Sequence, residues 1–270
     1  MTAGWNDVPS TSGPRRSLLR RVAAALAAAG AGVVKFAAVL LKFGAVLLKL
    51  KVITVFASMA VSVSAYALLG GWWFGLGLVG LLFAHEIGHV LELRRHGIPA
   101  SAPLFVPFLG AVVAMKQLPT NAWHEAQVAL AGPVLGSGAA ACVWAVGAYL
   151  DSRFLVALAY VGFLINLFNL LPTVPLDGGR AVAALHPAIW LVGLVGLVVL
   201  EIVRPSPILP IILILGVLDV RRRWRARHSA EAQGYYDVTP LQRAAVAFTY
   251  VGLAALLVIA MTATQVPRNF

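Results

Sequence analysis

The chain has 270 residues, of which 60% are hydrophobic and only 11% are charged, and its mean hydropathy is +0.88. Soluble domains carry about 25% charged residues, and a water-soluble globule of this size cannot bury so much apolar surface. Disordered chains are poor in apolar residues, so disorder is excluded as well. The composition therefore predicts an integral membrane protein.

Basic residues exceed acidic ones, with 21 Lys and Arg against 10 Asp and Glu, which gives a formal net charge of +11. They gather at the ends of apolar stretches, in clusters at 15–21, 94–95 and 221–227. This distribution is typical of the cytoplasmic loops of membrane proteins, and it argues against a nucleic-acid partner. Cys142 is the only cysteine, so an intramolecular disulfide is excluded.

Six apolar runs have the length of a membrane span, for which about 20 residues are needed. A shorter seventh run, at 208–220, contains a proline. The polar stretches between the runs are too short to form a domain with its own core. We therefore expect an all-α polytopic membrane protein with about six to seven transmembrane helices. The six long runs cover residues 52–70, 72–93, 126–149, 153–171, 186–203 and 241–262.

Residues 33–51 contain a seven-residue repeat that places Lys35, Lys42 and Lys49 on one narrow stripe of a helix. Such a helix either spans the bilayer with its lysines reaching toward the surface or lies in the interface. If it lies flat, the following spans bring the basic clusters at 94–95 and 221–227 to the side of the N-terminal arginines. If it spans, both clusters move to the opposite side. The positive-inside rule therefore favours an amphipathic, interfacial helix.

These features divide the chain into four parts. Residues 1–32 form a basic cytoplasmic N-terminus, and 33–51 form the interfacial helix. Residues 52–203 form an intramembrane core, and 204–270 contain the C-terminal membrane helices with a basic cytoplasmic loop at 221–240. We expect a multi-pass protein of the bacterial cell membrane with its N-terminus in the cytoplasm.

The second apolar run carries the sequence His85-Glu86-Ile87-Gly88-His89. Ionisable residues inside a spanning helix are costly and therefore point to a function. Positions i and i+4 share one helical face, so both imidazoles can bind one metal ion. Glu86 lies beside them, where it can take a proton from a water molecule on the metal. The spacing therefore predicts a metal site with Glu86 placed beside it as a proton acceptor.

A catalytic zinc site requires a third protein ligand, and Asp177 is the candidate. It lies in the segment NLLPTVPLDGG at 169–179. The two prolines of this segment end the preceding helix, and its two glycines permit a turn. Non-helical backbone at membrane depth requires surrounding protein or a water-filled cavity, which suits a site that needs both a carboxylate and water.

At these residues the chain resembles the site-2 proteases, a family of intramembrane zinc metalloproteases. The resemblance implies that His85, His89 and Asp177 bind one Zn²⁺ ion per chain and that Glu86 is the general acid and base. It also implies that Asn169 holds the substrate or stabilises the oxyanion. The residues that carry it are His85-Glu86-Ile87-Gly88-His89, Ala131-Gly132-Pro133 with Gly136, and the segment 169–179, all within 72–185.

Some site-2 proteases carry a PDZ domain between the two metal motifs, and others carry a CBS module at the C-terminal end. Here the segment 94–124 and the tail after residue 262 are too short for either domain. We therefore expect a minimal form of the family in which the membrane segments alone recognise the substrate.

The stretch 103–116 is apolar, contains two prolines, and has Gly110 at its centre. It is too short for a span, and its β-branched runs predict a small β-hairpin that re-enters the membrane near the active site. The family resemblance implies such an element as well. An exposed edge there can pair with an unwound substrate by strand addition. We therefore predict that Gly110, Val112 and Val113 bind substrate, with a membrane-surface loop as the alternative.

Other polar residues beside the apolar runs have structural interpretations. His124 and Glu125 lie where a helix begins, and we interpret them as a polar helix start rather than as a gate or an accessory ligand. Glu201 and Arg204 are three residues apart, and we expect them to form an ion pair on one helical face.

The sequence thus predicts a zinc-dependent intramembrane endopeptidase, a hydrolase that cuts a peptide bond within a transmembrane helix of a membrane-protein substrate. The expected partners are that transmembrane segment and the lipid bilayer, and the oligomeric state is left open. A transporter that uses the same residues as a proton or cation relay is an alternative, but it predicts internal repeats, and the two halves of the chain show none. A non-catalytic membrane scaffold with a vestigial site is a further alternative.

Overall fold

The chain divides into two compact units, Met1–Ile53 and Thr54–Phe270. The computed structural model describes residues 14–108, 110–112, 119–186, 188–226, 229 and 234–265. In the first unit the described backbone is helical from Pro14 onward. A helix over 33–51 agrees with the sequence, while its position on or across the membrane stays a prediction.

Helix α1 (Pro14–Arg95) is interrupted in the second unit at two neighbouring glycines. Gly70 and Gly71 have non-helical backbone angles, with φ of −150° and +83°. The second value lies in the left-handed region, where glycine is favoured because it lacks a Cβ atom. Two helical stretches, 54–69 and 72–95, therefore meet at a tight turn, as the adjacent apolar runs predict.

A two-stranded sheet follows α1 and precedes a series of helices. Side chains of Asn121, Ser152 and Thr239 accept hydrogen bonds from the first turns of α2, α3 and α8, so each of these helices begins where its sequence supplies a cap. The elements are β1 (Leu104–Val106), β2 (Gly110–Val112), α2 (Ala122–Tyr149), α3 (Arg153–Asn169), α4 (Asp177–Ala181), η1 (Val182–Ala184), α5 (Ile189–Val203), α6 (Leu209–Ala226) and α8 (Pro240–Ala263).

Three helical segments are long and apolar enough to cross a membrane, namely Val52–Arg95, Ala122–Tyr149 and Pro240–Ala263. The first contains the break at Gly70 and Gly71 and so holds two of the predicted apolar runs. Helices α3 and α5 are apolar but have 17 and 15 residues, which is below the usual length of about 20. The mainly helical fold with helices long and apolar enough to span a membrane is confirmed, whereas the number of six to seven transmembrane helices stays a prediction.

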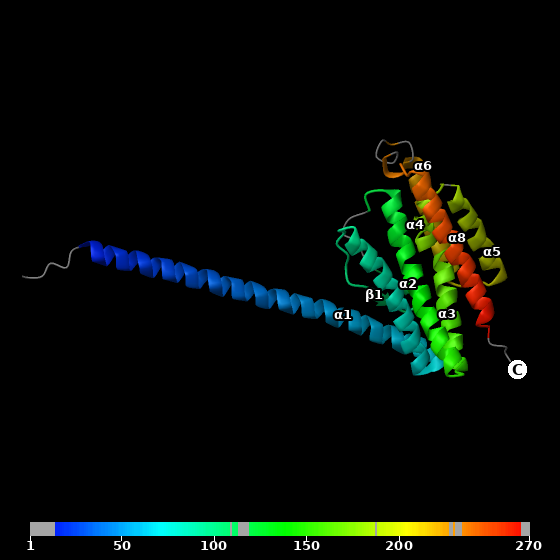
Figure 1. The fold of residues 1–270 in the computed structure, drawn as a ribbon, viewed down its shortest axis with the longest axis horizontal. Coiled ribbons are helices and arrows are strands. Elements are labelled where there is room, and N and C mark those ends of the chain that lie inside the picture. The colour runs from blue at the N-terminus through cyan, green and yellow to red at the C-terminus, as the bar shows by residue number, and fades with distance from the viewer. Residues whose placement is uncertain are drawn as a thin grey trace, which may run out of the picture. The chain divides into compact units, whose positions relative to one another are not determined.

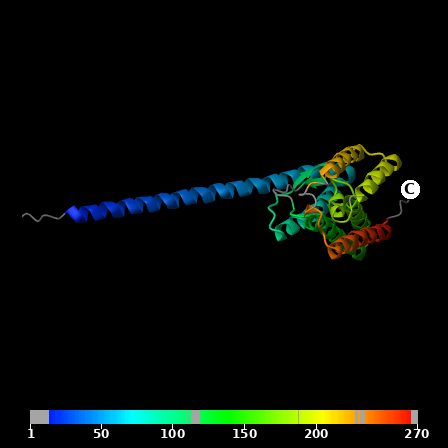
Figure 2. The same ribbon diagram turned by 90° about the horizontal axis from the view of Figure 1, so that it is seen from above.

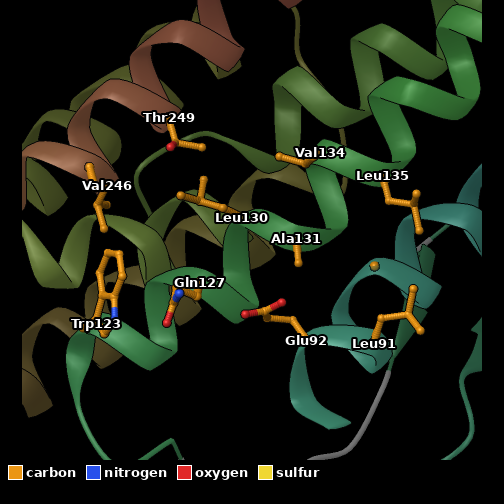
Figure 3. Close-up of a pocket in the computed structure, with 12 residues that line it drawn as sticks. Leu91, Glu92, Trp123, Gln127, Leu130, Ala131, Val134, Leu135, Val246 and Thr249 are labelled. Carbon is orange, nitrogen blue, oxygen red and sulfur yellow. The ribbon is translucent and has the colours of Figure 1, made fainter. Parts of the chain in front are cut away.

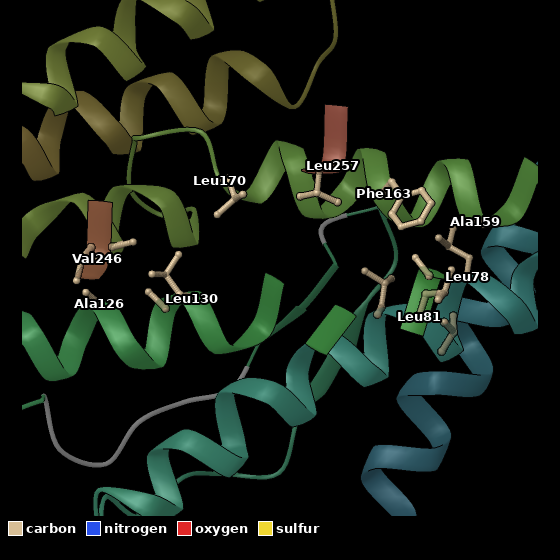
Figure 4. Packing of buried hydrophobic residues seen from close by; sticks show 14 of the residues in the cluster. Leu78, Leu81, Ala126, Leu130, Ala159, Phe163, Leu170, Val246 and Leu257 are labelled. Carbon is tan, nitrogen blue, oxygen red and sulfur yellow. The ribbon is translucent and has the colours of Figure 1, made fainter. Parts of the chain in front are cut away.

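The core of the second unit lies where α1, α2, α3 and α8 pack together (Figures 1 and 4). Its buried side chains include Leu78 and Leu81 of α1, Leu130 of α2, Phe163 of α3 and Leu257 of α8. Figure 2 shows α8 and the α5–α6 pair on different sides of α2 and α3. This packing fixes the C-terminal part of α1 against α2, which matters for the histidines that α1 carries.

The outer surface of this unit is apolar, as a bilayer requires. Leu68 and Phe248 expose 87% and 82% of their surface. Trp72, Trp73 and Tyr149 are also exposed near helix ends, where membrane proteins often place aromatic residues at the water interface. These features support the membrane environment that the composition predicts.

The basic ends of α1 and α6 lie at the same end of this unit, beside the start of α2. The ring centroid of His96, which follows the arginine pair at 94–95, lies 4.3 Å from the ring centroid of His124. The guanidinium of Arg223 lies 3.5 Å from the carboxylate of Glu125. Both arginine clusters are therefore on one side of the unit, as the positive-inside pattern requires. That this side is the cytoplasm stays a prediction.

Strands β1 and β2 form the predicted hairpin. A small antiparallel sheet in this stretch is therefore confirmed, while its re-entry into the membrane stays a prediction. Val113 lies outside the described residues. The paired residues are Leu104 with Val112, Phe105 with Ala111, and Val106 with Gly110.

The hairpin is attached to α1 through the outer edge of β1. The backbone N–H of Phe105 donates to Oγ of Ser58 at 3.2 Å, and the N–H of Phe108 donates to the hydroxyl of Tyr66 at 3.1 Å. Because the N–H of Phe105 points to Ser58, Phe105 and Ala111 form a non-hydrogen-bonded pair of the ladder. The N–H of Ala111 therefore points away from β1, toward the edge of β2 that no described strand pairs with.

Candidate metal centre

Two histidines of α1 and one aspartate of α4 converge on a single point. His85 and His89 lie one turn apart on α1, both buried, and their Nε2 atoms are 3.1 Å apart. The Oδ2 atom of Asp177 lies 3.0 Å from Nε2 of His85 and 3.2 Å from Nε2 of His89. One ligand atom from each residue falls within 4.8 Å of the others. The structure thus brings together the three residues that the sequence predicts as metal ligands.

Asp177 reaches the histidines because the chain leaves the helical path after α3. That helix ends at Asn169, and irregular backbone follows until α4 begins at Asp177. The turn is held from outside, since Nε1 of Trp190 donates a hydrogen bond to the carbonyl oxygen of Gly179 at 2.8 Å. The interruption predicted from the prolines of this segment therefore places the carboxylate opposite α1.

Hydrogen bonds on the far side of each imidazole define which nitrogen carries the proton. Nδ1 of His89 lies 2.8 Å from the carbonyl oxygen of Val128, which can only accept. Nδ1 of His85 lies 2.9 Å from Oδ1 of Asn166, whose amide nitrogen donates to the carbonyl of Gly162 at 2.8 Å. Both Nδ1 atoms therefore donate, which leaves a lone pair on each Nε2 in the neutral rings.

This donor set fits a metal ion. Two Nε2 lone pairs and a carboxylate oxygen face one another at 3.0–3.2 Å, and neutral rings with these tautomers supply no proton between them. Three acceptor atoms this close together repel one another, and a bound cation would remove that repulsion. Two histidines and one carboxylate form one of the ligand sets of catalytic zinc, which leaves a fourth position for water. Hydrogen bonds that orient metal-ligating histidines in this way are usual at such sites.

Two glycines of α2 make room for the site. A Cβ atom at Gly132 would lie 2.2 Å from Nε2 of His89, and a Cβ atom at Gly136 would lie 2.5 Å from Oδ1 of Asn166. Since a side chain at either position would overlap these groups, glycine allows α2 to approach both the metal ligand and the asparagine behind His85. This explains why the sequence Ala131-Gly132-Pro133 with Gly136 accompanies the histidine motif.

Glu86 is buried directly beside the three metal-binding candidates. In the part of the chain that the structure describes, its carboxylate accepts no hydrogen bond. It differs in this from Glu92, on the same helix, which pairs with Arg95 and His96. The position of Glu86 is compatible with the predicted general acid and base, and that role stays a prediction.

Asn169 and the hairpin residues have less direct relations to the site. Asn169 is half-buried at the end of α3, and among the described residues it forms no hydrogen bond with His85, His89 or Asp177. Asn166, one helical turn earlier, is the asparagine that contacts His85. The predicted roles of Asn169, Gly110 and Val112 in substrate binding therefore stay predictions.

The sequence did not indicate the contact of Asn166 with His85 or the buried ionic network around Glu125. Asn121 caps the start of α2, which agrees with a polar helix start. However, Glu125 is buried and contacts Arg180, Arg223 and Tyr235. An asparagine or glutamate inside an apolar helix indicates that it has a buried partner. Here the partners lie on other helices, so the spacing of residues along one helix does not identify them. The expected pair of Glu201 with Arg204 is not among the ion pairs of the described residues, where Glu201 instead accepts a hydrogen bond from the backbone N–H of Ser206.

A separate, mostly apolar cavity of about 410 Å³ lies between α1, α2 and α8 (Figure 3). Its lining includes Leu91, Glu92, Gln127, Leu130 and Val246, and it does not include the two histidines or Asp177. Gly88 also borders this cavity. The three metal-binding candidates are buried in the protein and lie outside the lining of this cavity.

Part of the chain is similar in sequence to known proteins. Residues 73–152 match the sequence model of Peptidase family M50. Over 135 residues the chain is 33% identical to Rip3 of Mycobacterium tuberculosis, and over 106 residues it is 27% identical to zinc metalloprotease MJ0392 of Methanocaldococcus jannaschii. Over 153 residues it is 25% identical to the chloroplastic protein EGY1 of Arabidopsis thaliana. All three carry the name zinc metalloprotease, which for Rip3 and EGY1 is provisional.

These similarities cover 46%, 37% and 39% of this chain, and 34%, 30% and 28% of the respective relatives. The chain thus spans about a third of the length of the curated relatives that it matches. The fold and the buried His–His–Asp group define a membrane protein with a candidate metal centre inside its helical core. Within residues 73–152 the chain is similar to peptidase family M50, the site-2 proteases.

Proposed function

We propose that the protein is a zinc-dependent intramembrane protease that hydrolyses a peptide bond in the transmembrane segment of a membrane-protein substrate. The observation that carries this proposal is the convergence of Nε2 of His85, Nε2 of His89 and Oδ2 of Asp177 within 4.8 Å. The similarity of residues 73–152 to peptidase family M50 and the names of the three relatives support the same chemistry.

His85, His89 and Asp177 would hold the zinc ion, with Asn166 and the carbonyl of Val128 fixing the orientation of the two imidazoles. A bound zinc ion would supply a Lewis acid for the scissile carbonyl and increase the acidity of water. Glu86 would accept the proton of the attacking water and then donate it to the nitrogen of the leaving amine. Asn169 would bind the substrate backbone or stabilise the developing oxyanion.

The substrate must unwind before it reacts, because a helical backbone keeps its carbonyl groups in intrahelical hydrogen bonds. In a bilayer an unwound segment needs other partners, since each missing bond costs several kcal/mol. The hairpin is a suitable partner. Its β1 edge is occupied by Ser58, whereas the N–H of Ala111 points outward from β2. We infer that the substrate adds as a strand along β2, with Gly110, Val112 and Val113 beside it.

The test uses the full chain reconstituted in lipid vesicles with a single-span model helix that carries a central glycine and proline. Glu86→Gln should lower the rate of cleavage at least about 100-fold, because general acid–base catalysis contributes this much or more. Glu92→Gln is the matched control on the same helix and should retain cleavage. Cleavage by Glu86→Gln at the wild-type rate would refute the proposed role of Glu86.

A further inference from the structure

The turn that carries Asp177 depends on anchors outside itself. Helix α4 has only 5 residues, Asp177–Ala181, and a helix this short is not stable on its own hydrogen bonds. Besides the contacts of Asp177 with His85 and His89, side-chain contacts attach it to α5 and α2. Nε1 of Trp190 on α5 donates to the carbonyl of Gly179, and Nε of Arg180 lies 3.5 Å from Oε1 of Glu125 on α2.

Glu125 is the centre of the second attachment. Its side chain is only 6% exposed, and the same Oε1 atom that faces Arg180 also lies 3.5 Å from Nη2 of Arg223 on α6. The hydroxyl of Tyr235 donates to Oε2 at 2.6 Å. Burial, together with the neighbouring Glu125 carboxylate, raises the pKa of the Tyr235 phenol above its ordinary value, so the phenol keeps the proton that it donates. Both carboxylate oxygens are therefore engaged.

The two attachments join into a closed loop through Arg223. Its guanidinium carbon lies 5.3 Å from the ring centroid of Trp190, and its Nε atom lies 2.7 Å from Oδ2 of Asp219. Arg223 thus contacts both Glu125 and the tryptophan that holds the Gly179 carbonyl. Two arginines, Arg180 and Arg223, face the carboxylates of Glu125 and Asp219. Each residue of this loop of contacts restrains the short turn that carries Asp177.

We propose that Glu125 is a positioning residue for the third metal ligand. It fixes Arg180 and Arg223, and through them it holds the Asp177 carboxylate at the distance from His85 and His89 that metal binding requires. The inference rests on the proposed zinc site. It assigns a role to the N-terminal turn of α2 and to the end of α6, which lie together at one end of the second unit near α4 (Figure 1).

The experiment measures the zinc affinity of the purified full chain by competition with a fluorescent zinc chelator. Glu125→Gln should weaken zinc binding about tenfold or more, because residues that orient metal ligands typically contribute 10- to 100-fold in affinity. Glu201→Gln is the matched control, since it also neutralises a partly buried carboxylate that accepts a hydrogen bond, here from Ser206. It should change the affinity by less than about twofold.

A double-variant comparison separates positioning from general stabilisation. If Glu125 acts through Asp177, then Glu125→Gln should cause no further loss of affinity in an Asp177→Ala background, because residues that act through one another are not additive. An equal loss in both backgrounds would overturn the proposal, and so would wild-type affinity in Glu125→Gln. The unfolding temperature of each zinc-free variant reports any purely structural effect.

A second variant keeps the test decisive if Glu125→Gln does not fold. Trp190→Phe removes the N–H that holds the Gly179 carbonyl and keeps an aromatic ring beneath Arg223. It should also lower zinc affinity, and an unchanged affinity would contradict the loop of contacts. Failure of the zinc site itself is distinguishable, because His85→Ala would then bind zinc as well as the wild type does. Loss in His85→Ala with no loss in Glu125→Gln rejects only the positioning role.

Discussion

The Nδ1 atom of His89 lies 2.8 Å from the carbonyl oxygen of Val128, which joins the motif helix α1 to α2 directly behind the metal-facing side of the ring. This contact leaves the Nε2 lone pair of His89 directed at Asp177 and His85. It exists only because α2 approaches α1 closely at Gly132, beside the same imidazole. The metal centre is therefore built by helix packing as much as by the ligands themselves.

Gly132→Ala should reduce zinc affinity. The new Cβ atom would lie 2.2 Å from Nε2 of His89, so the ring or α2 must move, and the ligand would leave its position. Gly138→Ala on the same helix is the control, because a Cβ atom there has no neighbour within 4 Å. Zinc competition should show a loss of about tenfold for the first variant and none for the second. Equal affinities would mean that the close approach of α2 is not needed.

Asn166 and Asn169 should separate metal binding from turnover. Asn166→Ala removes the acceptor for Nδ1 of His85, so it should weaken zinc binding about tenfold. Asn169→Ala should leave zinc affinity unchanged and lower the cleavage rate, because Asn169 is proposed to act on the substrate. Parallel measurement of zinc affinity and cleavage in both variants tests this. The assignment would be reversed if Asn169→Ala lost zinc and Asn166→Ala did not.

Proline at Ala111 should lower cleavage while zinc content stays normal. The N–H of Ala111 points to the outer edge of β2, so proline removes the donor that strand addition of the substrate would use. Ala111→Ser keeps the N–H and is the control. Val112→Pro is a less suitable test, since the N–H of Val112 points toward β1 within the hairpin. Wild-type turnover in Ala111→Pro would reject strand addition on this edge.

The orientation of the chain can be tested with single cysteines in a variant that lacks Cys142. Cysteines placed near Arg94 and Arg222 should both resist a membrane-impermeant reagent in intact cells, because the two arginine clusters lie at one end of the unit and the positive-inside rule assigns that end to the cytoplasm. A cysteine at the exposed Gln265, just after α8, should be labelled. Labelling at Arg94 and Arg222 but not at Gln265 would show the inverse topology.

The histidine motif and Asp177 could be predicted from sequence because their signal is local. His85 and His89 share a helical face by spacing alone, and Asp177 follows two prolines that end a helix in an apolar environment. The small hairpin was also predictable, since the apolar stretch around Gly110 is too short to span. In each case the prediction depends on the properties of a few consecutive residues.

The supporting contacts could not be predicted because their partners are distant in sequence. Glu125 reads as an ordinary polar residue near a helix start, yet its partners Arg223 and Tyr235 lie 98 and 110 residues further along. Asn166 is one of two asparagines on α3, and the sequence does not distinguish them. Only the packing of α3 against α1 shows which one contacts His85. Spacing along one helix does not define which face meets which neighbour.

Zinc content by elemental analysis tests the central claim most directly, since it asks whether His85, His89 and Asp177 form a metal site at all. The wild type and Glu86→Gln should each contain about one zinc ion per chain, because Glu86 is not a ligand. The double variant His85→Ala/His89→Ala should contain almost none, and Asp177→Ala should contain less than the wild type. Full zinc content in the double variant, or no zinc in a folded wild-type protein supplied with the metal, would contradict the account.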